Sequence, residues 1–184
     1  MLRQLKPHEQ KLLKKVNLYD WKRENNVREI QILRRYRIQK REDYTKYNKL
    51  AGEIKSLVVK LGAMDAADEV RREVSDQLTR KCFHLGLITS DSSLAACAKV
   101  SASSFCRRRL PVVMVRLKMS ENLKEAVTFI EQGHVRVGPD VVTDPAFLVN
   151  RAFEDYVTWV DSSKIKEKVM KYNDALDDFD LLGN

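Results

Sequence analysis

Residues 126–140, AVTFIEQGHVRVGPD, decide the fold class of this chain. Up to Ile130 the apolar residues follow helical spacing, and from His134 onward apolar and polar residues alternate as they do in a half-buried strand. Gly133 stands between the two patterns, where a helix commonly ends in a positive φ. Residues 138–140, Gly-Pro-Asp, are typical of a turn between strands. The sequence therefore predicts a helix to Gly133 followed by a short hairpin, and with it an α+β fold.

Downstream of this stretch the sequence continues with short extended segments. Residues 141–142, 147–149 and 156–160 are rich in valine and aromatic residues and are predicted as strands. Residues 161–163, Asp-Ser-Ser, can cap a last helix that runs to about Tyr172. The tail from Asp174 to Asn184 holds four aspartates and no basic residue, and we expect it to be loosely ordered.

Upstream of the stretch the pattern is helical. We predict a short helix over 7–16, with Trp21 anchoring this segment, and one long helix over 26–61 that stops near Gly62. Further helices are predicted over 66–85 with Asp65 as N-cap and Gly86 as C-terminal signal, over 93–99, over 101–117, and from Ser120 or Asn122 to Gly133. Pro111 lacks a backbone donor, so we expect a kink or a break in the helix that contains it.

Composition limits the class of protein. The chain has 184 residues, of which 43% are hydrophobic and 33% charged, so it can bury a core beneath a charged surface. The sequence contains no run of about 18 apolar residues, so we predict no membrane-spanning helix. We also see no secretory signal at the N-terminus. Cys82, Cys97 and Cys106 are odd in number and far apart, which excludes a disulfide framework or CxxC zinc site and fits a reducing compartment.

The charge of +8 is distributed unevenly. Residues 1–60 carry a net +10 and residues 121–184 a net −6. A basic front half is typical of proteins that bind a polyanion, most often nucleic acid. The alternative is a well-solvated surface on a soluble protein.

The sequence offers little for catalysis. His8, His84 and His134 have no partner at metal-ligand spacing, and there is no glycine-rich phosphate loop and no GxSxG motif. The adjacent pairs Glu154-Asp155 and Asp177-Asp178 have diverging side chains and do not form an acid–base pair. We therefore expect no enzyme, no metal and no cofactor.

Two basic clusters are the candidate binding residues. Arg107, Arg108 and Arg109 would spread over a broad sector of a helix, so that two could face phosphate while one lies along the core; the alternative is a solvated helix face. The second cluster is Arg34, Arg35, Arg37, Lys40 and Arg41. Tyr36, Tyr44 and Tyr47 lie among these bases and could stack on unpaired nucleotides, or could instead pack against a neighbouring helix.

Several motifs together resemble the RNA-binding domain of the small-subunit ribosomal protein S-four family. They are Arg109-Leu110 opening a helix that Leu117 closes, Ala126 and Ile130 in the next helix, Gly133-His134-Val135 entering a strand, and Pro145-Ala146-Phe147-Leu148-Val149 after it. The resemblance covers roughly residues 105–165. It implies a helix-turn-helix packed on a small β-sheet.

A longer resemblance spans nearly the whole chain. Residues 5–14, 33–37, 41–44, 102–111, 131–140 and 158–166 are similar to the S-four-like proteins of the U-three small nucleolar ribonucleoprotein, a family within the small-subunit processome. The resemblance implies a nucleolar RNA-binding adaptor that helps U-three small nucleolar RNA pair with precursor ribosomal RNA. It also implies two protein partners, an acidic M-phase phosphoprotein and a Brix-domain protein.

One departure from the ribosomal family concerns the second helix. That region is rich in arginine in the ribosomal proteins, whereas this chain has Glu121, Leu123 and Val127, and Gly138-Pro139-Asp140 replaces the usual Asn-Gly turn. Fewer base contacts are expected on this face, and part of the domain could dock protein. The bases that remain, with one histidine, complete the set of candidate RNA-binding residues: Arg107, Arg108, Arg109, Arg116, Lys118, Lys124, His134 and Arg136.

We therefore expect a basic helical extension over 1–62, a helical body over 63–104, an S-four-like domain over 105–172 and an acidic tail over 173–184. The favoured function is an RNA-binding assembly factor of the processome. The alternative is a structural ribosomal protein of the S-four family, which the acidic tail and the missing arginines disfavour. A module of an RNA-modifying enzyme would need a catalytic domain for which the chain has no room.

Overall fold

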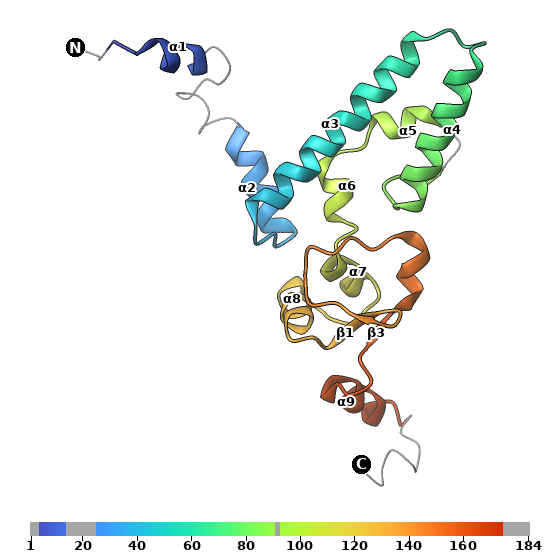
Figure 1. Ribbon diagram of the computed structural model, residues 1–184. Coiled ribbons are helices and arrows are strands. Elements are labelled where there is room, and N and C mark those ends of the chain that lie inside the picture. Colours follow the sequence, from blue (N-terminus) through green and yellow to red (C-terminus); the bar gives the residue numbers. More distant parts are fainter. Residues whose placement is uncertain (1–3, 14–24, 91–92, 175–184) are drawn as a thin grey trace.

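The computed structural model describes residues 4–13, 25–90 and 93–174. Helices come first and a small sheet follows (Figure 1). The elements are α1 (Pro7–Leu13), α2 (Asn25–Arg35), α3 (Arg41–Ala63), α4 (Glu69–His84), α5 (Leu94–Ala98), α6 (Ala102–Cys106), α7 (Leu110–Arg116), α8 (Leu123–Glu131), β1 (Val135–Val137), β2 (Asp140–Val141), the 3₁₀ helix η1 (Arg151–Tyr156), β3 (Val157–Trp159) and α9 (Lys164–Tyr172). The predicted α+β class is confirmed.

The sheet has three antiparallel strands in the order β2-β1-β3. Val137 pairs with Asp140 across the turn and with Val157 on the other side. Val135 and Val137 are buried, as the alternating pattern predicted. The predicted strand over 147–149 is wrong: Leu148 forms only an isolated bridge with Arg109, because this segment pairs with the start of α7 and not with the sheet.

The predicted helix over 26–61 is two helices, α2 and α3. The chain turns at residues 36–40, where Arg37 has a φ of 47°. Arg37 N–H donates to Arg34 O and Ile38 N–H donates to Leu33 O, the pair of bonds of a Schellman motif. Tyr36 and Ile38, within this turn, are both buried.

One other boundary differs from the sequence prediction. The α4 helix begins at Glu69, because Asp68 and not Asp65 caps it by accepting from Val70 N–H. The break expected in the helix that contains Pro111 is confirmed: the chain leaves the helix between Cys106 and Leu110, and Pro111 lies in the first turn of α7, where its missing donor costs nothing. The α1 helix ends at Leu13, and the rest of the predicted 7–16 helix, Trp21 and the acidic tail beyond Asp174 lie outside the described residues.

Two apolar cores divide the described chain. The first joins Tyr36, Tyr47 and Ala51 with Cys82, Cys97 and Phe105, so α3 shares one core with α4, α5 and α6. The second joins α7 and α8 with the sheet, through residues such as Leu110, Met114, Ile130 and Val135. In Figure 1 the long helices lie at one end and the sheet with α7 and α8 at the other. No helix in the described part combines the length and apolar character needed to cross a membrane.

Candidate RNA-binding site

The chain crosses from the first core to the second at residues 107–109. The α6 helix ends at Cys106 and α7 begins at Leu110, so the arginine run lies in the connection and not on a helix face. Arg108 and Arg109 are 4% and 2% exposed, whereas Arg107 is exposed. The expectation that two of the three guanidinium groups face outward is therefore corrected to one.

Arg108 ties the connection to the C-terminal segment. Its Nε and Nη2 donate to the carbonyl of Val149 at 2.9 and 2.7 Å, and its Nη1 donates to Glu154 at 3.0 Å. Val149 N–H in turn donates to Arg108 O at 2.8 Å. A buried guanidinium needs such partners, because leaving its donors unsatisfied costs free energy.

Arg109 ties the same connection to the first core. Its Nη1 donates to Asp43 and to the Tyr47 hydroxyl, both at 3.3 Å, and both acceptors are on α3. Tyr47 also stacks on Phe105 with ring centroids 5.7 Å apart. Burial raises the pKa of Tyr47, which keeps its phenol protonated at neutral pH. The two buried arginines thus join the two cores, one to each side.

Gly86 lies directly against Arg108. Its φ is +72°, and a Cβ at this position would be 2.8 Å from the Arg108 guanidinium carbon. Gly86 therefore provides both the helix end after α4 and the space for the buried side chain. The sequence marked Gly86 as a helix stop, and that is confirmed, but it gave no signal of this contact.

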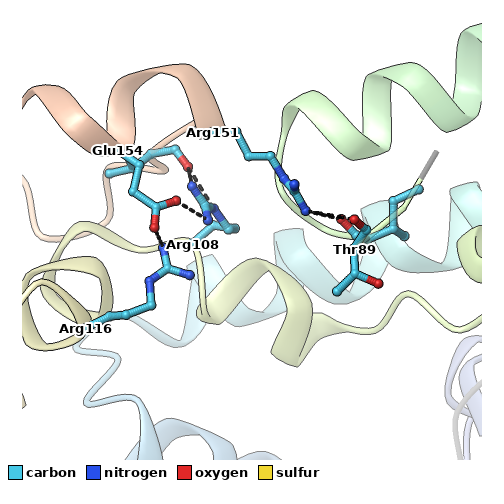
Figure 2. A network of polar contacts seen from close by, with 7 residues as sticks. Thr89, Arg108, Arg116, Arg151 and Glu154 are labelled. Atoms are coloured by element: carbon cyan, nitrogen blue, oxygen red, sulfur yellow. Dashed lines mark hydrogen bonds and ion pairs between the residues drawn. The ribbon is translucent and has the colours of Figure 1, made fainter.

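A pocket of about 520 Å³ opens beside the connection, and four arginines line it: Arg107, Arg108, Arg116 and Arg151. Glu154 lies between Arg108 and Arg116 and forms an ion pair with each (Figure 2). Arg151 donates to the carbonyls of Ile88 and Thr89 and lies 4.0 Å above the Phe83 ring. Arg107 and Arg116 are therefore the exposed bases of this pocket, and Glu154 and Asp155 also line it. A guanidinium group can bind a phosphate oxygen. Sequence analysis gave no binding role to Arg151, which has no basic neighbour in the sequence, and considered Glu154 only as half of an acid–base pair with Asp155.

The second basic cluster lies at the turn between α2 and α3. Arg34, Arg35, Arg37 and Lys40 are exposed on it. Arg41 is held by Glu29 through bonds of 2.6 and 3.1 Å, and this carboxylate raises the pKa of Arg41. The cluster is separate from the arginine pocket, although the Gln39 side chain joins the turn to Glu131 of α8 at 2.5 Å.

The tyrosines within this cluster pack into the protein. Tyr36 is 9% exposed and Tyr47 6% exposed, and Tyr44 is half-buried against the same core. Packing against neighbouring helices, the alternative that sequence analysis left open, is what the structure has at Tyr36 and Tyr47.

The remaining candidate residues are spread over the C-terminal domain. Lys118 and Lys124 are exposed, and Lys118 lines a shallow pocket with Glu121 and Glu125. His134 lies with its Nδ1 3.0 Å from the Ser163 hydroxyl. Arg136 donates to Thr158 and Asp161, and hydrogen bonding from Lys166 together with the charge of Arg136 lowers the pKa of Asp161. These residues form no single cluster with the arginine pocket.

The cysteines are placed as apolar core residues. Cys82, Cys97 and Cys106 are all buried and free. Burial raises the pKa of Cys82 to about 12 and that of Cys106 to about 11, so both thiols stay protonated. Within the described residues, no three His, Cys, Asp or Glu side chains are grouped to hold a metal ion.

Comparison with protein families divides the chain at this same connection. The model of the ribosomal protein S4/S9 N-terminal domain matches residues 4–107, and the model of the S4 domain matches residues 108–153. The fold and both matches define a two-part protein of the ribosomal S4 (S-four) class.

Similar proteins extend the match over the full length. The chain is 55% identical to human U3 small nucleolar ribonucleoprotein protein IMP3 and 51% identical to the protein of that name from Saccharomyces cerevisiae. Each alignment covers 98% of this chain and 99–100% of the relative. The archaeal small ribosomal subunit protein uS4 of Nanoarchaeum equitans is 23% identical over 80% of the chain. The chain therefore belongs to the S4 family and, within it, to the family of these IMP3 proteins.

Proposed function

We propose that the protein is an RNA-binding component of the U3 small nucleolar ribonucleoprotein that acts in ribosome biogenesis. Identity above 50% over nearly the full length of the human and yeast IMP3 proteins is the observation that carries this proposal. The exposed bases at the arginine pocket and at the α2–α3 turn supply phosphate-binding groups. The relatives named in the comparison are ribonucleoprotein components, and an adaptor function fits the absence of any catalytic motif in the sequence.

The finer function we propose is to promote pairing of U3 small nucleolar RNA with precursor ribosomal RNA in the nucleolus. Exposed bases on two separate surfaces, the arginine pocket and the α2–α3 turn, could hold two RNA segments near one another. The acidic M-phase phosphoprotein and the Brix-domain protein are the partners we propose within the same complex.

Replacement of the yeast relative tests this function directly. Yeast cells depleted of their own IMP3 protein would express this chain, and the readout is the ratio of unprocessed to mature small-subunit ribosomal RNA. We expect restored processing and recovery of U3 small nucleolar RNA with the tagged chain. A stably expressed chain that restores neither would contradict the proposal.

A structural ribosomal protein of the S4 family is the second candidate, because the archaeal uS4 protein aligns over four fifths of the chain. Sedimentation separates the two functions. An assembly factor is expected with large precursor particles, whereas a structural protein would co-sediment with mature small subunits.

A further inference from the structure

The 3₁₀ helix η1 separates two pockets of opposite character. Its residues Arg151, Glu154 and Asp155 line the arginine pocket, whereas Phe153 and Tyr156 line a second, apolar groove of about 410 Å³. The β1–β2 turn forms the opposite wall of this groove through Pro139 and Asp140, and Phe147 contributes a third aromatic ring. The groove lies on the C-terminal domain and has no part in the arginine network.

Three aromatic side chains of the groove are exposed to solvent by more than a third of their surface. Phe153 is 47% exposed, Tyr156 60% and Phe147 36%. Scattered apolar residues on a surface are ordinary, but three aromatic rings around one concave site are typical of an interaction surface.

Backbone hydrogen bonds hold the walls of the groove in place. Gly138 N–H donates to Tyr156 O at 3.0 Å, which fastens the turn to the end of η1. Phe147 O accepts from Leu110 N–H at 2.9 Å, which fastens the third wall to α7. A preformed groove loses little conformational entropy when it is filled, which favours binding.

The charged residues around the groove indicate which class of partner it binds. Residues 138–156 contain four acidic residues and one basic residue, but Glu154, Asp155 and Arg151 line the arginine pocket, so Asp140 is the charged residue in the described lining of the groove. The one base, Arg151, turns to the carbonyls of Ile88 and Thr89, and no lysine or arginine is among the described residues lining the groove. Asp140 is exposed in its lining, and Asp144, whose backbone carbonyl accepts from Phe147 N–H at 3.2 Å, is exposed as well. Phosphate would be repelled here, so the aromatic rings do not suit an RNA backbone.

We propose that this groove, lined by Phe147, Phe153, Tyr156 and Asp140, docks a segment of a partner protein in which an aliphatic or aromatic side chain is flanked by lysine or arginine. The apolar side chain fills the groove, and the flanking bases face Asp140 and Asp144. The inference is independent of RNA binding, because it uses the opposite face of η1.

Selection from a random library of 12-residue peptides on the full-length protein tests the proposal. We expect enriched peptides to carry an apolar residue with basic neighbours, and Phe153→Ser with Tyr156→Ser to weaken their binding about tenfold. Val59→Ser and Tyr172→Ser remove apolar side chains from α3 and α9 that are more exposed than Phe153 and Tyr156, and they should leave binding unchanged. Thermal midpoints of all variants check folding.

Asp140→Lys is the second, independent variant, since Asp140 is exposed and its replacement does not touch a core. It should weaken the basic-flanked peptides and strengthen versions whose lysines are replaced by glutamate. Failure to enrich any peptide, or equal binding to the folded variants, would overturn the proposal. A 12-nucleotide oligouridine that loses more affinity than the peptides in the Phe153/Tyr156 variant would also overturn it and assign the rings to base stacking.

Discussion

At the scale of single residues, three consecutive arginines have different surroundings. Arg108 and Arg109 donate to fixed acceptors inside the protein, and Arg107 faces solvent. The acceptors come from α3 and from the segment around Val149, far away in the sequence. For this reason the sequence could predict a basic cluster here but not which of its members are buried.

The first prediction separates these functions. Arg109→Ala should lower the free energy of unfolding by about 3 kcal/mol or more, because it leaves Asp43 without its buried partner. Arg107→Ala should change stability by no more than about 0.5 kcal/mol and should weaken RNA binding instead. Urea denaturation and titration with U3 RNA provide the two measurements. Equal losses of stability in the two variants would contradict the distinction.

The second prediction concerns Gly86, which needs both a positive φ and an absent side chain. Gly86→Ala should destabilise the protein by about 2 kcal/mol, because strain in the backbone adds to a clash with Arg108. Gly133 has a φ of +74°, but an added Cβ would make only ordinary contacts at 3.9 Å. Gly133→Ala should therefore lower the free energy of unfolding by about 1 kcal/mol.

Gly52→Ala is the matched control, since this glycine lies inside α3 with open space around it. It should stabilise the protein by about 0.5–1 kcal/mol. A Gly86 variant as stable as the Gly133 variant in urea denaturation would show that Arg108 moves aside without cost.

At the scale of elements, the same helix ending recurs. Schellman bonds close α4 at Gly86 and α8 at Gly133, and the same pattern closes α2 at Arg37 and α7 at Lys118. Arg37 and Lys118 have positive φ angles of 47° and 59°. Sequence analysis found the two glycine endings because glycine is a recognised stop signal. It missed the ending at Arg37, and so joined α2 to α3, because a basic residue is no such signal and the apolar period runs across the turn.

The third prediction follows from this strain. Arg37→Gly should raise the free energy of unfolding by about 0.5–1 kcal/mol, because glycine adopts a positive φ without the steric cost of a side chain. Arg35→Gly, within the last turn of α2, removes a base of equal charge but should destabilise the helix by a similar amount. Thermal midpoints compare the two variants, and the same direction of change in both would argue against a strained turn.

At the scale of the whole molecule, the family boundary coincides with the connection between the two cores. The sequence predicted a boundary at 104–105, and the two family models meet between residues 107 and 108. It also predicted a basic extension over 1–62 as a separate unit. The described core instead combines α3 with α4, α5 and α6, because Tyr47 and Ala51 pack with Cys97 and Phe105. The run of positive charge at the front of the chain therefore does not coincide with a separate apolar core among the described residues.

The last prediction tests how RNA affinity is divided between the two basic surfaces. In the full-length chain, changing Arg34, Arg35, Arg37 and Lys40 together to glutamine removes four exposed charges at the α2–α3 turn. Changing Arg107 and Arg116 to glutamine removes the exposed bases of the arginine pocket.

Each phosphate contact contributes about 0.7–0.9 to the slope of log affinity against log salt. Because the front of the chain carries most of the positive charge, we expect the turn variant to reduce the slope by about 2–3 and the pocket variant by about 1–2. Titrations with U3 RNA between 50 and 200 mM salt, about the range over which such contacts are resolved, give the slopes. An unchanged slope in the turn variant would assign these four bases to a protein interface, and RNA binding would then rest on the C-terminal domain.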